Sequence, residues 1–305
     1  MILKNNIILK KNNYLTRASA SILGFSDIDN RFQIAIKINQ LSSNTYFNYI
    51  NQLAKLSLHC KKTPNLLSQD ELDSYLSLLS DQCSSTSKTS LKLCIYGLSF
   101  YFRKILHIKD YLFLPNVVQK STLPVVFSRV ECKRIFSVIK NLKHRVCLTL
   151  IYSAGLRVGE LCSLKIWDID FDRMTITVRQ GKGNKDRCIP LSVLLKKGLI
   201  QYYNEYGPSG FVFFSGKDKS TPYSSRSVQH ILNKAMEAAF ILKKGASPHT
   251  LRHTFATHLL ENGTNIVRIQ QLMGHSDIKS TLIYTRLVNA NYGMVVSPLD
   301  SLYQV

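Results

Sequence analysis

The stretch SPHTLRHTFATHLLENGTNIVRIQQLMGHSDIKSTLIYTR, from Ser247 to Arg286, decides the fold of the second half of the chain. It predicts three short helices. Ser247 is suited to the N-cap of the first helix, and Pro248 to its first position, where the missing N–H needs no partner. Thr264 is suited to capping the second helix, which Gly274 would close as a left-handed residue.

Four side chains of this stretch carry chemistry. His249 and Arg252 are three positions apart and project together from the first helix. Gly274 fixes His275 at a corner, and Tyr284 lies on the third helical turn. Two imidazoles, a guanidinium and a phenol on a rigid set of short helices suit a site that grips an anion and attacks it.

Charge and composition indicate a globular protein with a polyanionic partner. The 305 residues are enough for two domains, and 45% of them are apolar. The net charge is +21, with 15 Lys and Arg against 7 Asp and Glu in residues 1–122 and 25 against 12 in residues 123–305. Both halves are therefore basic. Nucleic acid is the commonest partner of such a chain. The alternatives are an anionic lipid surface as the partner, or a basic charge that serves only to keep the protein soluble.

The cysteines indicate a reducing compartment. Seven of them occur, with no C-x-x-C pair, which argues against a disulfide framework and a zinc knuckle. The N-terminus is too polar for a signal peptide, and no apolar run approaches the length of a membrane span. We expect a cytoplasmic protein, associated with the nucleoid, that has no membrane partner.

The order of patterns along the chain predicts two domains. Residues 1–37 are interpreted as an extension or arm, with Phe32 to Ile38 as a strand or part of that arm. Residues 38–108 show helical periodicity and predict an all-α bundle, and residues 109–123 lose periodicity and form a linker. A mainly helical α+β domain with a small antiparallel sheet is predicted over residues 124–290, and residues 291–305 form a tail.

Two further motifs of the second domain present basic side chains. A helix ends at Gly155, so that Arg157 lies at the start of the next helix after a tight turn. An alternating strand then leads into the turn Gly181 to Lys185, and Arg187 to Leu191 returns. This pattern predicts a β-hairpin tipped by lysines.

These residue types match the needs of phosphodiester cleavage. Arg157 and Arg252 each present a planar fork to two phosphate oxygens and stay charged. His249 and His275 add hydrogen bonds or move protons. Lys182 reaches the leaving oxygen as an acid, and Tyr284 attacks as a phenolate favoured by the two arginines. A phosphotyrosine ester stores the bond energy, so strands are rejoined without ATP.

A zinc site is the main chemical alternative. His249 and His253 lie four positions apart on one helix, but Thr250 stands where the metalloprotease motif has glutamate. His258 lies near the apolar stripe and is interpreted as a packed core residue. We therefore expect neither a metal nor another cofactor.

Four segments together resemble the tyrosine recombinases, the group of phage and transposon integrases and Xer proteins. The segments are AGLRVGEL (Ala154–Leu161), GKGNKDRCIPL (Gly181–Leu191), HTLRHTFATHLLENG (His249–Gly263) and LMGHSDIKSTLIYT (Leu272–Thr285). Their order and spacing match the family over about residues 120–290. The helical bundle is similar to the family's SAM-like core-binding domain.

The resemblance implies a role for each residue. Arg157, His249, Arg252 and His275 would bind and activate the scissile phosphate, and Glu160 would orient Arg157 from behind. Lys182 would protonate the 5′-hydroxyl leaving group. Tyr284 would form the 3′-phosphotyrosyl link. Lys182 is assigned instead of Lys185 because it occupies the family's position between the two glycines.

The resemblance also implies partners. The family closes a two-domain clamp on double-stranded DNA and works as a homotetramer in the synaptic complex, with each C-terminal tail on a neighbour. A monomer is the candidate state in solution. The apolar segment Met294 to Val296 is a candidate for that docking, and a loosely packed tail is the alternative. Residues 1–37 favour an integrase of a mobile element, with an accessory directionality factor as a further partner. A type IB topoisomerase and a protein that only binds DNA are the competing functions.

Overall fold

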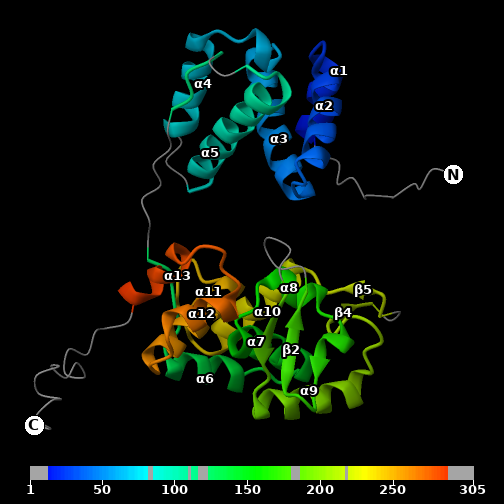
Figure 1. Cartoon of the computed structure of the whole chain (residues 1–305), viewed down its shortest axis with the longest axis vertical. Coiled ribbons are helices and arrows are strands. Elements are labelled where there is room, and N and C mark those ends of the chain that lie inside the picture. Colours follow the sequence, from blue (N-terminus) through cyan, green and yellow to red (C-terminus); the bar gives the residue numbers. More distant parts are fainter. Residues whose placement is uncertain are drawn as a thin grey trace, which may run out of the picture. The chain divides into compact units, whose positions relative to one another are not determined.

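The computed structural model describes residues 13–81, 85–108, 111–115, 123–179, 186–216 and 219–287. These form two compact units, each with its own hydrophobic core, and the division falls between Lys120 and Ser121. Figure 1 shows the helices and strands that make up each unit. The predicted lysine turn, which includes Lys182, and the predicted tail of residues 291–305 lie outside the described residues.

The N-terminal unit is built from helices. They are α1 (Asn13–Ser21), α2 (Phe25–Ile38), α3 (Ser43–Cys60), the short η1 (Pro64–Leu66), α4 (Gln69–Asp81), α5 (Ser85–Phe100) and the π-helical η2 (Tyr101–Ile105). The long α3 packs against α1, α2, α4 and α5. It supplies Ile50, Leu53 and Leu56 to the core, all fully buried. The predicted bundle of apolar stripes is therefore confirmed for this unit.

The interpretation of Phe32 to Ile38 as a strand or arm is wrong, because the segment is the second half of α2. Its alternation is the end of a longer helical pattern, in which Phe25, Ile28 and Phe32 are buried at helical spacing. Ile34, which the strand pattern would bury with Phe32, is 58% exposed. From Asn13 onward the N-terminal segment thus consists of helices that pack into the unit.

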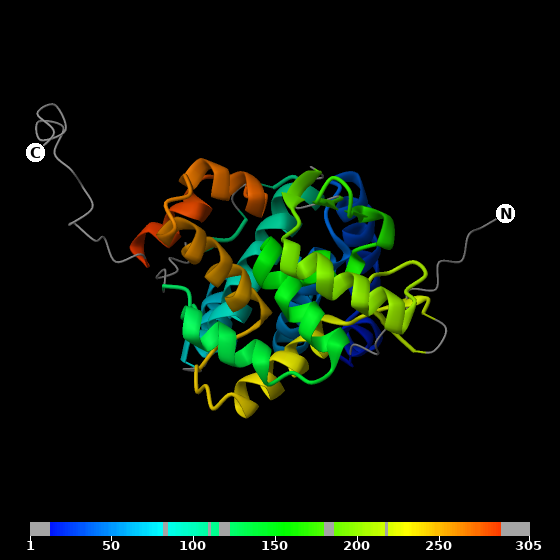
Figure 2. The ribbon, with the colours of Figure 1, turned by 90° about the horizontal axis from the view of Figure 1, so that it is seen from below.

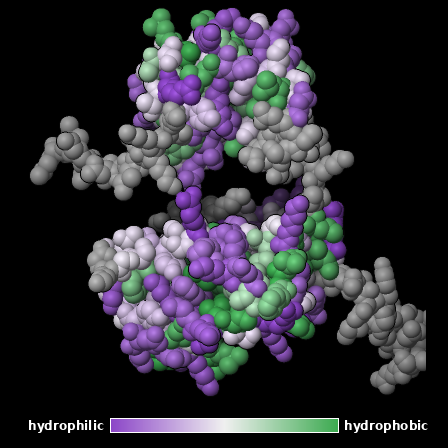
Figure 3. Space-filling view, turned by 180° about the vertical axis from the view of Figure 1, so that it is seen from behind, coloured by the Kyte–Doolittle hydropathy of each residue, from purple (hydrophilic) through white to green (hydrophobic). Residues whose placement is uncertain are grey.

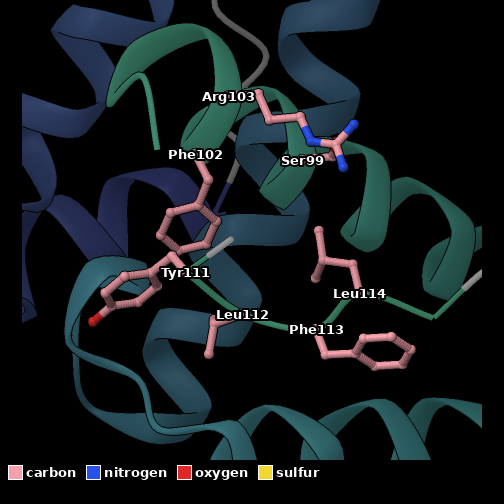
Figure 4. Close-up of a pocket in the computed structure, with 7 residues that line it drawn as sticks. All are labelled: Ser99, Phe102, Arg103, Tyr111, Leu112, Phe113 and Leu114. Atoms are coloured by element: carbon pink, nitrogen blue, oxygen red, sulfur yellow. The ribbon is translucent and has the colours of Figure 1, made fainter. Parts of the chain in front are cut away.

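Residues 111–115 of the predicted linker lie on the N-terminal unit. The Tyr111 hydroxyl donates to the Asn65 carbonyl at 2.5 Å, and the Phe113 N–H donates to Gln69 Oε1 at 2.8 Å. Tyr111 also stacks on Phe102, with ring centroids 4.9 Å apart. A cavity of about 410 Å³ forms here, in which Arg103 is the one charged lining residue (Figure 4).

The C-terminal unit is mainly helical and contains two small antiparallel sheets. Its helices are α6 (Arg129–Ser137), α7 (Leu142–Ala154), α8 (Val158–Ser163), η3 (Ile166–Asp168), α9 (Val193–Tyr206), α10 (Ser225–Ala238), α11 (Pro248–Glu261), α12 (Ile266–Met273), α13 (Lys279–Leu282) and η4 (Ile283–Arg286). Its strands are β1 (Ile169–Asp170), β2 (Thr175–Val178), β3 (Arg187–Pro190), β4 (Phe214–Ser215) and β5 (Thr221–Pro222). The order β1-β2-β3 places the predicted hairpin in register, with Ile176 opposite Ile189.

The central helix of the C-terminal unit is α7, which packs against α9 and α11 (Figure 2). Its apolar residues are buried on several sides, and Gly155 ends it in the left-handed conformation, as predicted. A capping box is present at the start of α6, where Ser128 and Glu131 exchange hydrogen bonds. These local signals fix where α6 begins and where α7 ends.

The predicted fold class, an all-α N-terminal domain and a mainly helical α+β domain with a small antiparallel sheet, is confirmed. The face drawn in Figure 3 is a mosaic of hydrophilic side chains interrupted by smaller hydrophobic areas. Within the part of the chain that the structure describes, none of the helices is long and apolar enough to cross a membrane.

Candidate active site

Arg252 is held at the centre of the C-terminal unit by the ends of two helices. As predicted, Pro248 begins α11 after the N-cap Ser247. The Arg252 side chain is buried, with Nη1 donating to the Gly155 carbonyl at 2.6 Å and Nη2 to the Met273 carbonyl at 2.5 Å. Glycine is required at this turn, because its φ is +60° and a Cβ there would lie 2.4 Å from the Phe255 ring. The guanidinium is thus locked in place by main-chain atoms.

Arg157 reaches the same place from the start of α8. It is the N-cap residue of that helix, as predicted. Its Nη1 donates to Glu160 Oε1 at 2.7 Å, and its Nη2 donates to the Gly274 carbonyl at 3.0 Å. Gly274 is the left-handed residue that ends α12, as predicted, whereas the N-cap of α12 is Asn265, and the prediction of Thr264 as that cap is wrong. Asn265 fits the role because its side-chain oxygen accepts the Val267 N–H at 2.8 Å.

Arg187 is a member of this cluster that the sequence analysis did not single out. Its Nη1 and Nη2 donate to the two oxygens of Glu160 at 2.9 and 2.7 Å, and its Nε donates to the Leu272 carbonyl at 2.8 Å. The side chain is only 9% exposed. Arg187 begins β3 inside one of the quoted segments, but its partner lies 27 positions away, so no local pattern reveals the pair.

Glu160 therefore neutralises several guanidinium groups at once. Besides Arg157 and Arg187, it lies 3.7 Å from Nη1 of Arg252. Burial alone would raise the pKa of Glu160, but hydrogen bonds from Arg187 and Arg157 outweigh it and lower the pKa to about 2. The carboxylate stays ionised at neutral pH. Its negative charge offsets the repulsion between the guanidinium groups and fixes their positions.

The depressed pKa of Glu160 predicts a contribution to stability that depends on pH. The contribution is fully present above pH 4.5, the ordinary glutamate value, and is lost as the pH falls towards about 2. The difference corresponds to about 3 kcal/mol. Urea unfolding should give Glu160→Gln a lower free energy of unfolding than the wild type at pH 7. This difference should become smaller below pH 4.5. An equal gap at both ends of this range would contradict the assignment.

Tyr284 lies in η4 and is buried, with 1% of its surface exposed. Its hydroxyl is 2.9 Å from Nδ1 of His253, and its ring is nearly parallel to that of His275, with centroids 6.5 Å apart. Burial raises the pKa of Tyr284 to about 12, although Arg252 and Arg157 lower it in part. The expected direction of the arginine effect is right, but the expectation of a favoured phenolate is wrong, because burial is the larger effect.

The three histidines around Tyr284 are neutral at physiological pH. Burial and the neighbouring arginines lower the pKa of His275 to about 4, and burial with His249 and Arg252 does the same for His253. The pKa of His249 is lowered by desolvation, Arg252 and Arg157. Neutral imidazoles both donate and accept hydrogen bonds, as a phosphate site with proton transfer needs.

The structure thus brings the described members of the predicted site together. Arg157, His249, Arg252, His275 and Tyr284 interact within one cluster. Lys182 lies outside the described residues. His258 is buried and bonds to the Tyr152 hydroxyl at 2.9 Å, which confirms it as a packed core residue. The described residues hold no cluster of three metal-type ligands.

Comparison with known proteins identifies the family in which this arrangement occurs. Residues 126–290 match the model of the Phage integrase family, and residues 29–110 match the model of the phage integrase N-terminal SAM-like domain. The chain belongs to the phage integrase family. The integrase-family resemblance drawn from the four sequence segments is confirmed, and the enzyme is of the tyrosine recombinase type.

Two curated relatives and one solved structure illustrate how far this tyrosine recombinase resembles known ones. The putative integrase/recombinase y4qK of Sinorhizobium fredii is 33% identical over 88% of this chain and 86% of its own. The tyrosine recombinase XerA of Thermococcus onnurineus is 40% identical over 66% of this chain and 72% of its own. A lambda integrase dimer bound to a COC′ core site has the same fold, with a TM-score of 0.69, 20% identity and coverage of 89% of this chain and 97% of the other.

Proposed function

We propose that this tyrosine recombinase is of the integrase or transposase type and cleaves and rejoins DNA strands at a specific site. The reaction passes through a 3′-phosphotyrosyl intermediate and a Holliday junction. It needs neither metal nor ATP, because the tyrosyl ester keeps the bond energy. The observation that carries the proposal is the cluster of two fixed guanidinium groups and neutral imidazoles around the buried phenol of Tyr284.

Each residue of the cluster has one task in this proposal. Arg157 and Arg252 bind the non-bridging oxygens of the scissile phosphate and stabilise the charge that grows on them. His249 and His275 hydrogen-bond the same oxygens, and Tyr284 attacks phosphorus. Lys182 protonates the departing 5′ oxygen. Glu160 orients Arg157 without touching the substrate, since its own oxygens are taken by guanidinium groups.

The proposed partner is double-stranded DNA carrying a specific recombination site. The net charge of +21, basic in both halves, supports phosphate contacts that supply most of the affinity and make binding weaken steeply with salt. The neighbour bound to its core site supports the same partner. We further propose that the protein forms a homotetramer in the synaptic complex, with the tail of residues 291–305 on a neighbour. An accessory directionality factor is a further proposed partner. The proposed location is the nucleoid in the cytoplasm.

The proposal is tested with a nicked suicide duplex. The duplex is selected from a randomised pool by binding to the protein, and its nick lets the short cleaved strand diffuse away so that the covalent product accumulates. The reaction is run in EDTA and resolved by denaturing electrophoresis, and peptide mapping locates the linkage. We expect a metal-independent adduct at Tyr284.

Other outcomes separate the competing functions. Adducts that form equally on unrelated duplexes, with relaxation of plasmids that lack the site, would indicate a type IB topoisomerase. Tight binding to the selected duplex without any adduct would indicate a protein that uses this fold only to bind DNA. The order of the two domains and the segment from Gly274 to Asp277 favour the recombinase over a topoisomerase. The cluster around Tyr284 favours it over a protein that only binds DNA.

A further inference from the structure

The hydroxyl of Tyr284 has one hydrogen-bond partner among the residues that the structure describes, and it is His253. The distance from Oη to Nδ1 is 2.9 Å, and the two ring centroids are 5.7 Å apart. Tyr284 is 1% exposed, which leaves little room for a water molecule as an alternative partner. The contact joins α11 to η4, two elements that are 31 positions apart at these residues.

The protonation states fix the direction of this hydrogen bond. Burial raises the pKa of Tyr284 to about 12, so the phenol keeps its proton at neutral pH. Burial, with His249 and Arg252, lowers the pKa of His253 to about 4, so the imidazole carries only one. A buried phenol proton needs an acceptor, and Nδ1 is the one at hand. Tyr284 therefore donates to Nδ1, and the other ring nitrogen of His253 carries the N–H.

The two predicted histidines do not serve the phenol in this way. Nδ1 of His275 lies 2.9 Å from Oγ1 of Thr281, and its ring only stacks on Tyr284. His249 is an exposed residue, although neighbouring atoms desolvate part of its ring and lower its pKa, and it can therefore meet a phosphate. Both are thus suited to the phosphate oxygens, whereas His253 faces the nucleophile.

We propose that Nδ1 of His253 takes the proton of Tyr284 as the phenol oxygen attacks the phosphate. The O–H bond breaks and its proton passes to Nδ1, while a bond forms between Oη and phosphorus. The bond from phosphorus to the 5′ oxygen breaks, and that oxygen takes a proton from Lys182, as proposed above. In rejoining, His253 returns its proton to Tyr284. The inference deepens the proposed function and rests on it.

A weakly basic imidazole is sufficient for this step. As the bond from Oη to phosphorus forms, the phenol oxygen loses electron density and its proton becomes far more acidic than in free tyrosine. The groups facing His253 are His249 and Arg252 on its own helix, His275 after α12, and the phenol itself. A bound phosphate anion offsets the positive charge of Arg252 and raises the pKa of His253 towards the working pH.

The test compares two histidines of α11 that make the same contact. In His253→Asn the amide oxygen still accepts the hydrogen bond but cannot take the proton. His258→Asn is the matched control, because His258 bonds through Nδ1 to the Tyr152 hydroxyl at the same 2.9 Å outside the cluster. Single-turnover adduct formation should slow by about 10²- to 10³-fold in His253→Asn and stay unchanged in His258→Asn.

A second substrate separates this role from that of Lys182. When sulfur replaces the 5′ oxygen, the thiolate leaves without a proton. Lys182→Ala should recover on this substrate, whereas His253→Asn should stay slow. The rate of His253→Asn should instead rise about tenfold per pH unit, because hydroxide takes the phenol proton in place of the imidazole. The rate of the wild type should change little with pH. A role in folding alone would lower the rate without that slope.

The outcomes are distinguishable from failure of the proposed function. If the wild type forms no adduct on the selected duplex, the recombinase proposal fails. If the wild type forms the adduct and His253→Asn forms it as fast, or faster, His253 is not the acceptor. Thermal unfolding and DNA binding of both variants are measured alongside, and His253→Gln replaces His253→Asn if the latter does not fold.

Discussion

Tyr284→Phe is expected to bind the selected duplex as tightly as the wild type and to form no covalent adduct. The change removes one oxygen atom, the nucleophile, and leaves the ring in its buried site beside His275. The lost hydrogen bond to His253 should cost about 1 to 3 kcal/mol of stability. Electrophoretic mobility shifts measure the binding, and denaturing gels of the suicide reaction measure the adduct.

Tyr152→Phe is the matched control for this variant. Tyr152 also donates from a partly buried hydroxyl to Nδ1 of a histidine on α11, at the same distance of 2.9 Å. The same atom is removed from the same kind of pair, so the two variants should lose similar stability. Only Tyr284→Phe should lose the adduct. An adduct that persists in Tyr284→Phe would assign the attack to another residue.

Arg252→Lys is expected to reduce the rate of cleavage by about 10²- to 10³-fold. The buried guanidinium bonds to two carbonyls at once, from Gly155 and Met273, while it presents a face to the cluster. An ammonium group keeps the charge but not this fork. Burial and Arg157 lower the pKa of Arg252 to about 9, which still leaves it charged at neutral pH. Single-turnover kinetics measure the loss.

The affinity of Arg252→Lys for DNA should fall much less than its rate, because one contact among many phosphate contacts is changed. Arg129→Lys is the control, since the side chain of Arg129 is 53% exposed and pairs with Glu261 on the surface. It should cleave at the wild-type rate. Equal cleavage rates for both variants would mean that Arg252 only joins the ends of α7 and α12. Arg252→Lys would then lower the melting temperature without slowing cleavage.

The parts of the fold that the sequence predicted are those fixed by neighbouring residues. Pro248 after Ser247 and the left-handed Gly155 and Gly274 are signals within one turn of the chain, and the helix ends follow them. The alternation around Phe32 misled the analysis, because seven residues are too few to separate a strand from the end of an amphipathic helix.

The parts of the site that the sequence did not predict depend on contacts between distant residues. His253 meets Tyr284, and Arg187 meets Glu160, only because separate elements pack together. No spacing along the chain encodes either pair. The net effect on the pKa of Tyr284 was missed for a related reason, since burial is a property of the assembled core and outweighs the charge of the two arginines.

The carboxylate of Glu160 makes the energetic effects of substitutions at its arginine partners depend on one another. A neutral residue there leaves the guanidinium groups of Arg157 and Arg187 facing each other without a counter-charge, and loss of Arg187 leaves a buried carboxylate half satisfied. We therefore expect the loss of stability in a Glu160→Gln, Arg187→Gln double variant to be smaller than the sum of the losses in the two single variants. The two positions form one energetic unit, although α8 and β3 lie far apart along the chain.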